Sequence, residues 1–115
     1  MNYFLYQDDI PSNIEFGDII AIDTETMGLN LQRDRLCLIQ LSSGDKNAHL
    51  VQISRKSLEN KNSFINLKKI FNNPNSTKLF HFARFDIAVI EKHICKLNGP
   101  VYCTKIASKL SRTFG

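Results

Sequence analysis

The sequence predicts an α/β fold built on a mixed sheet, with its elements in the order βββαβαβα. Three apolar, strand-like segments come first, and segments with helical periodicity then alternate with shorter strands. Strands joined by short turns pair in antiparallel fashion, whereas strands separated by a helix are added in parallel. A length of 115 residues with 43% hydrophobic residues fits one domain, so we expect residues 1–115 to form a single, partial domain.

The three leading strands are expected at residues 18–23, 35–41 and 47–53. The first, "DIIAID", is almost continuously apolar, which favours a central position in the sheet. The segment "SSGDK" separates the second strand from the third, and Gly44 within it can adopt the positive φ of a hairpin turn. These strands therefore predict an antiparallel meander.

A helix is predicted over residues 63–71, where Phe64, Leu67 and Phe71 recur at helical spacing. Ser63 is the expected N-cap, and Pro74 stands just beyond the end.

The remaining elements alternate between strand and helix. A strand is predicted at 77–82, a largely buried helix at 83–97, a short strand at 101–103 and a last helix at 104–114. The sheet should therefore be completed by strands with crossover helices.

Composition and charge narrow the function classes. The net charge of +4 and pI near 9.1 suit a polyanionic partner, and a solvated basic surface is the alternative that charge alone leaves open. No apolar run is long enough for a membrane span, and the N-terminus lacks a signal-peptide pattern, so a cytoplasmic protein is expected. Cys37, Cys95 and Cys103 fit no disulfide framework and are expected to be reduced, structural thiols.

Two carboxylates, Asp23 and Glu25, end the most hydrophobic strand. Residues i and i+2 of a strand share a face, so their charges would repel unless a cation neutralises them. Oxygen ligands favour Mg²⁺ or Mn²⁺ over zinc. Taken alone, the pair is also consistent with ordinary acids at a strand end.

Asp86 is expected in the first turn of the helix that follows the strand at 77–82. Such an acid can simply complement the helix dipole. Sites in open α/β sheets nevertheless form where strands end and helices begin. Asp23, Glu25 and Asp86 could therefore converge on one pair of metal ions.

These residues lie in two motifs that resemble the DEDD superfamily of 3′-to-5′ exonucleases. "AIDTETMGL" looks like the first motif of that superfamily and "HFARFD" like the second, while "DRLCLIQLS" and "CTKIAS" are similar to the ribonuclease D branch. The resemblance covers roughly residues 18–112. It implies an RNase H-like fold and a nuclease that uses two Mg²⁺ or Mn²⁺ ions about 3.5 to 4 Å apart.

The resemblance also implies a role for individual residues. Asp23 would bind both metals, Glu25 the metal that activates the attacking water, and Asp86 the other metal. The substrate-binding positions implied are Met27, Gly28, Leu29, His81, Arg84 and Phe85. Phe85 is expected to act more through packing than through chemistry, and a His before a helix is often only a capping or core residue.

A third motif of the family is not found. It would supply a fourth Asp, with a Tyr or His four residues earlier as general base, and no such pattern follows Asp86. The only acid there is Glu91, about 140° away around the helix from Asp86. We therefore expect a C-terminally truncated exonuclease domain that is inactive or impaired alone. Either a second polypeptide or self-association covers the missing half, or the chain is a fragment, or it is the product of a decaying gene. Cys103 is a smaller departure, since the family commonly has Asp there as a helix cap, which leaves Thr104 as the expected cap.

Three functions remain open at this stage. The first is a ribonuclease D-like 3′-to-5′ exoribonuclease acting on structured RNA such as tRNA precursors, and the second is a DNA-directed exonuclease of the same superfamily. The third is a catalytically inactive remnant that binds nucleic acid through basic side chains. These basic residues are Arg33, Arg35, Arg84, Lys105, Lys109 and Arg112.

Overall fold

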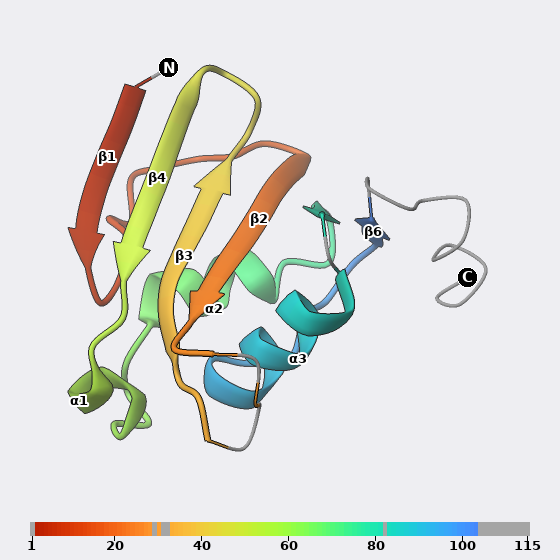
Figure 1. The fold of residues 1–115 in the computed structure, drawn as a ribbon. Coiled ribbons are helices and arrows are strands. Elements are labelled where there is room, and N and C mark those ends of the chain that lie inside the picture. Colours follow the sequence, from red (N-terminus) through yellow and green to blue (C-terminus); the bar gives the residue numbers. More distant parts are fainter. Residues whose placement is uncertain (1, 29, 31–32, 82, 104–115) are drawn as a thin grey trace.

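The computed structural model describes residues 2–28, 30, 33–81 and 83–103, and shows a six-stranded mixed sheet with helices on one face (Figure 1). The strand order across the sheet is β1-β4-β3-β2-β5-β6. The elements in chain order are β1 (Asn2–Gln7), β2 (Ile19–Thr26), β3 (Leu36–Ser42), β4 (Asn47–Gln52), α1 (Arg55–Leu58), α2 (Ile65–Phe71), β5 (Thr77–Phe80), α3 (Ala83–His93) and β6 (Val101–Cys103).

The strand pairing confirms the predicted sheet. β2 pairs with β3 and β3 with β4 in antiparallel fashion, whereas β5 joins β2, and β6 joins β5, in parallel. Gly44 has φ of +83° in the hairpin between β3 and β4, as predicted. β2 extends to Thr26, three residues further than expected, so the strand persists through both carboxylates.

Two elements were not predicted. β1 is an edge strand that lies parallel to β4, and α1 is a single helical turn after β4. The predicted helix at 104–114, with its expected cap Thr104, lies outside the described residues.

Asp8 fastens the end of β1 to the start of α1. Its Oδ1 accepts hydrogen bonds from the Ser54 backbone N–H at 2.7 Å and the Ser57 hydroxyl at 2.9 Å, and its Oδ2 accepts from the Ser54 hydroxyl at 2.9 Å. Burial alone would raise the pKa of Asp8, but these hydrogen bonds outweigh it and lower the pKa below its usual value. The charged carboxylate is therefore the form that holds this corner.

Asp9 caps α2 across a distance of more than fifty residues in sequence. Its Oδ2 accepts from the Asn66 N–H and its Oδ1 from the Leu67 N–H, both at 3.0 Å. The prediction of Ser63 as N-cap was wrong, because Phe64 holds the cap position in a left-handed conformation and makes no side-chain cap hydrogen bond. A remote carboxylate supplies the acceptor that a local Ser usually provides.

The core lies between α2, α3 and the face of the sheet that they cover (Figure 1). It is formed by fully buried apolar side chains whose alternation along the strands matches the covered face. Its largest members are Phe71, Phe80, Ile10, Ile20, Ile39, Leu36, Leu41, Leu67, Val51, Val89 and Ile90.

α3 is shorter than predicted and ends at His93 rather than at residue 97. The Cys95 N–H bonds to the Ile90 carbonyl, five residues back, which makes a wider turn that closes the helix. The Leu97 N–H then donates to Glu91 Oε2 at 3.0 Å. Glu91 therefore holds the helix end, and does not extend the acidic motif.

A buried lysine of β5 joins two loops, the one between α2 and β5 and the one between α3 and β6. Lys78 is fully buried, and its Nζ donates to the carbonyl oxygens of Asn73 at 2.5 Å, Ser76 at 3.1 Å and Asn98 at 2.5 Å. Desolvation lowers its pKa. Gly99 passes so close to the same loops that a Cβ there would come within 2.7 Å of the Ser76 carbonyl oxygen. The turn that leads into β6 therefore requires glycine.

In the part of the chain that the structure describes, no helix has the length and apolar character needed to cross a membrane.

We predict that Asp9→Ala destabilises the protein by about 1 to 2 kcal/mol, because two N–H groups at the start of α2 lose their acceptor. Ser63→Ala is the matched control, and it should leave stability unchanged since Ser63 does not cap the helix. Urea unfolding of both variants measures the difference. Equal stabilities, or a larger loss in Ser63→Ala, would contradict the assignment of the cap.

Candidate active site

β2 separates its polar residues between the two faces of the sheet. Asp23 and Glu25 are exposed on the uncovered face, while Thr24 between them is buried on the covered one. Asp23 pairs with Gln40 of β3 and Glu25 with Leu38, and the register shifts just after Glu25. The two carboxylates therefore share a face, as the alternation predicted, and a bulge follows them immediately.

Asp86 lies in the first turn of α3, as predicted, and only 3% of it is exposed. The Thr24 hydroxyl donates to Asp86 Oδ1 at 2.5 Å. Asp86 Oδ2 is also buried, and it has no hydrogen-bond partner among the described residues. Half of this buried carboxyl group is therefore satisfied and half is not.

The environment of Asp86 disfavours its negative charge. Burial is the main cause that raises the pKa of Asp86, to about 6, and the charges of Asp23 and Glu25 raise it further, while the hydrogen bond from Thr24 acts in the opposite direction. The charges of Asp23 and Glu25 on β2 therefore act on the Asp86 carboxyl at the start of α3.

A divalent cation suits this donor set. Asp86 Oδ2 is buried and has no partner among the described residues, and the carboxylates of Asp23 and Glu25 are near enough to affect its charge. Carboxylate oxygens are the ligands that Mg²⁺ and Mn²⁺ prefer. In the same part of the chain, however, no three His, Cys, Asp or Glu side chains are already gathered as a metal-binding group. The convergence of Asp23, Glu25 and Asp86 on metal ions therefore stays a prediction.

The turn after β2 brings Met27 and Gly28 to the surface. Met27 is exposed, and a Cβ at Gly28 would collide with Asp34 Oδ2. The Asp34 carboxylate is held by the Asn30 N–H at 2.9 Å and by Arg33 Nε at 3.0 Å, so it cannot easily give way. A side chain at position 28 would therefore have to displace the Asp34 carboxylate, whether or not a nucleotide approaches Gly28.

The other predicted substrate-binding residues are only partly described. His81 is exposed, and its backbone carbonyl accepts a hydrogen bond from the Cys103 thiol at 3.0 Å. Phe85 is half-buried against the core, which fits the packing role expected for it. Leu29 and the side chain of Arg84 lie outside the described part of the chain.

A shallow hollow of about 230 Å³ adjoins Asp23 on the uncovered face of the sheet. β2, β3 and β5 contribute to it, and Asp23, Gln40 and His81 are its polar residues at the end near the carboxylates. Two predicted site residues, Asp23 and His81, therefore line one cavity.

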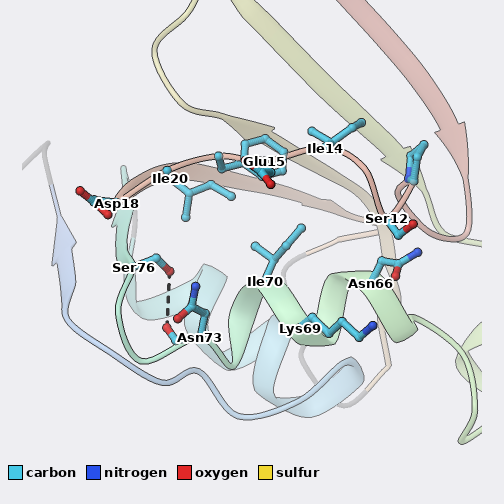
Figure 2. A pocket seen from close by; sticks show the side chains of 13 residues that line it. Ser12, Ile14, Glu15, Asp18, Ile20, Asn66, Lys69, Ile70, Asn73 and Ser76 are labelled. Atoms are coloured by element: carbon cyan, nitrogen blue, oxygen red, sulfur yellow. Dashed lines mark hydrogen bonds between the residues drawn. The ribbon is translucent and has the colours of Figure 1, made fainter.

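A second cavity, of about 390 Å³, lies at the opposite end of β2 (Figure 2). It is bounded by the loop before β2 and by α2, with Glu15, Ile20, Lys69 and Ile70 among its lining residues. None of the predicted site residues lines it.

Sequence reasoning missed Thr24 and Gln40. Thr24 lies between the two acids and was given no role from the sequence, yet alternation turns it toward the start of α3. Gln40 lies directly opposite Asp23 on the same face. The antiparallel pairing of the first two predicted strands could have suggested Gln40, but the exact register required the structure.

The comparison with protein families now gives the class of protein. The family model described as 3'-5' exonuclease matches residues 8–113. The chain therefore belongs to the 3′-5′ exonuclease family, and the six-stranded mixed sheet matches the RNase H-like fold expected from the resemblance.

Particular relatives sharpen this placement. Brucella melitensis NrnC superposes with a TM-score of 0.83 and 43% sequence identity over 100% of this chain and 55% of that one. Structures of NrnC with bound Mg²⁺ and bound to pGG match equally well, with TM-scores of 0.83 and 0.84. Escherichia coli RNase D, an exoribonuclease involved in structured RNA processing, matches with a TM-score of 0.55 and 28% identity over 74% of this chain and 21% of that one.

The curated Ribonuclease D of Zymomonas mobilis is 33% identical over 97 residues, which are 84% of this chain and 24% of the relative. The chain thus spans about half the length of NrnC and about a quarter of this ribonuclease D.

We predict that Asp86→Asn stabilises the metal-free protein at neutral pH. A carboxyl group whose pKa is raised by folding binds more protons in the folded state, so stability falls as pH rises from about 4 to about 6. The substituted amide carries no charge and escapes this loss, so the variant should gain about 1 to 2 kcal/mol at pH 7. Urea unfolding in EDTA at several pH values measures the gain.

The control for this prediction is Asp45→Asn, in the exposed hairpin between β3 and β4. Asp45 accepts a hydrogen bond from the Asn47 N–H, which lowers its pKa, so its loss should not stabilise the protein. A gain for Asp86→Asn that is absent, or that does not grow between pH 4 and pH 6, would contradict the buried-charge explanation.

Proposed function

We propose that this chain is an RNase D-like 3′-to-5′ exoribonuclease domain that hydrolyses phosphodiester bonds with two divalent metal ions. The buried Asp86 carboxylate carries this proposal, because one of its oxygens bonds to Thr24 while the other has no partner among the described residues. A purely structural acid would be satisfied on both oxygens or exposed to water. Asp86 instead keeps one carboxylate oxygen without a partner among the described residues, while the other is bound to the strand that carries Asp23 and Glu25.

Asp23, Glu25 and Asp86 would hold the ions, through side chains set by β2 and by the first turn of α3. When bound, two such ions supply an activated water and stabilise the leaving oxygen of the cleaved bond. Thr24 fixes the orientation of Asp86 through the hydrogen bond to its Oδ1, which leaves Oδ2 for a metal ion. The hollow beside Asp23 would receive part of the terminal nucleotide, with His81 at its edge.

The relatives support the substrate class. Escherichia coli RNase D is involved in structured RNA processing, and NrnC has been solved with bound Mg²⁺ and bound to pGG. RNA is therefore a better candidate substrate than DNA, with structured RNA or tRNA 3′ ends as the target and Mg²⁺ or Mn²⁺ as the cofactor. The cytoplasm, where such RNA is processed, is the proposed compartment.

The fourth carboxylate and the general base would come from sequence other than these 115 residues. No Tyr-x-x-x-Asp or His-x-x-x-Asp pattern follows Asp86, and the missing pair supplies both a metal ligand and the proton acceptor. A second polypeptide, or further sequence of the same protein, would complete the site. Alone, this domain should bind metal weakly and cleave poorly or not at all.

Two other functions remain candidates. A DNA-directed exonuclease of the same family would use the same acids, and no described residue is identified as a reader of a 2′-hydroxyl. A domain that only binds nucleic acid would rely on its net charge of +4 and would need no metal. Metal binding distinguishes a domain that only binds nucleic acid from the two exonucleases. A comparison of RNA with DNA as substrate distinguishes the exoribonuclease from the DNA-directed exonuclease.

We predict that the purified chain binds Mn²⁺ and that Asp23→Ala and Asp86→Ala each weaken this binding at least about tenfold, because each removes a direct ligand. Asp45→Ala, which removes an exposed acid in the hairpin, should leave the affinity unchanged. Electron paramagnetic resonance of free Mn²⁺ measures the affinity without requiring activity. Equal affinity in all three variants would exclude these acids as the metal site.

Cleavage is tested separately with a 5′-labelled RNA and the matching DNA, in Mg²⁺ or Mn²⁺. The chain alone should shorten neither the RNA nor the DNA appreciably. When a segment that carries the third motif of the family is added, the RNA should be shortened from its 3′ end. Shortening that persists in Asp23→Ala, or no shortening with the added segment, would contradict the exoribonuclease proposal.

A further inference from the structure

We propose that two copies of this chain associate through the outer edge of β1, which no described strand pairs, with the two β1 strands antiparallel and the two sheets joined into one. This inference concerns the edge of the sheet opposite β5 and β6, and it does not depend on the proposed nuclease activity. β1 stands at the end of the strand order, with β4 as its only neighbouring strand in the described structure (Figure 1).

The outer edge of β1 offers a row of backbone groups that no described strand pairs. The Asn2 N–H donates to the Lys46 carbonyl at 2.8 Å and the Asp8 N–H to the Gln52 carbonyl at 2.7 Å, both on the β4 side. Backbone groups alternate in direction along a strand, so the even-numbered residues face β4 and those of Tyr3, Leu5 and Gln7 face outward. Such a row is a template for another strand.

The side chains of β1 suit association rather than solvent. Tyr3 is 65% exposed, Phe4 42% and Leu5 63%, so three large apolar residues stand exposed in succession. Proteins commonly protect an edge strand with a charged residue, a proline or a bulge, and "NYFLYQ" contains no charged residue and no proline. Its pairing with β4 also runs without a register shift.

The absence of charge favours a second copy as the occupant. Two identical strands that carried charges would bring like charges together under two-fold symmetry, whereas β1 brings none. The edge is also fixed in place before association, because Asp8 and Asp9 fasten the end of β1 to α1 and α2. Little conformational entropy is therefore lost when β1 pairs.

One register of the two β1 strands allows both backbone hydrogen bonds and contacts between apolar side chains. With Phe4 on the two-fold axis, Tyr3 of one copy lies opposite Leu5 of the other, and the outward-facing backbone groups of these two residues can exchange hydrogen bonds. Tyr3 and Leu5 then cover each other on one face of the sheet, and the two Phe4 rings meet on the other. The next register, centred on Leu5, would instead place Tyr3 opposite Gln7. Asp8, with φ of +67°, ends the extended segment just beyond.

Sedimentation velocity over a range of concentrations tests the association. The wild-type chain should form a dimer as concentration rises, and Leu5→Lys should remain a monomer because it places two charges in the interface. Ile65→Lys is the matched control, since Ile65 is a similarly exposed apolar residue on α2, and it should dimerise like the wild type. Far-UV circular dichroism checks that each variant is folded.

Disulfide trapping tests the register. Phe4→Cys should form a covalent dimer linked through position 4, because directly opposed residues of a non-hydrogen-bonded antiparallel pair come close enough for a disulfide. Leu5→Cys should form much less of this dimer. The wild type under the same oxidation controls for Cys37, Cys95 and Cys103, none of which is in a disulfide in the described structure. Peptide mass mapping identifies the link.

Each remaining outcome overturns the proposal. A chain that is monomeric at all concentrations would exclude self-association and leave the edge to a different protein partner. A dimer that survives Leu5→Lys would place the interface elsewhere. A link at position 5 in preference to position 4 would exclude the stated register.

Discussion

The hydrogen bond from Thr24 to Asp86 joins the two halves of the candidate site, and the other features of the site follow from it. It connects the end of β2 to the first turn of α3, two elements separated by more than fifty residues. The parallel register of β2 with β5 makes it possible, since Ile22 pairs with Phe80 and α3 begins three residues after Phe80. Because Thr24 points toward α3, alternation turns Asp23 and Glu25 to the other face.

The acids of the site could be predicted because they follow local rules. Asp23 and Glu25 end an apolar strand, and Asp86 lies in the first turn of a helix. Hydrophobic periodicity predicts both elements, and sites in open sheets form where strands end and helices begin. The role of Thr24 depends on the pairing of β2 with β5, which no local pattern encodes. The same holds for Gln40, whose place opposite Asp23 depends on the register of β2 and β3.

The fold shows the same division between local and long-range determinants. The meander of β2, β3 and β4 was predictable from apolar runs and a glycine turn, whereas β1 was missed. β1 is exposed along nearly its whole length, so it lacks the alternation between buried and exposed residues that marks a strand. Its place is fixed from outside, by the hydrogen bonds of Asp8 to Ser54 and of Asp9 to α2. The cap of α2 was misassigned for the same reason, because the acceptor comes from Asp9 and not from Ser63.

Two buried ionisable groups, Lys78 and Asp86, differ in how far the described structure satisfies them with hydrogen bonds. Lys78 donates to three carbonyl oxygens, which satisfies all three of its protons and makes it a junction between loops. Asp86 has one hydrogen bond, one oxygen without a partner among the described residues and two negative charges nearby. The hydrogen bonds of Lys78 offset the free-energy cost of burying its charge. The single side-chain hydrogen bond described at Asp86 leaves part of that cost uncompensated. Natural sequences keep such a deficit chiefly where function needs it, because a neutral residue at the same place would fold more stably. A cation shared with Asp23 and Glu25 would offset the deficit at Asp86, which links the stability of this junction to the chemistry proposed for it.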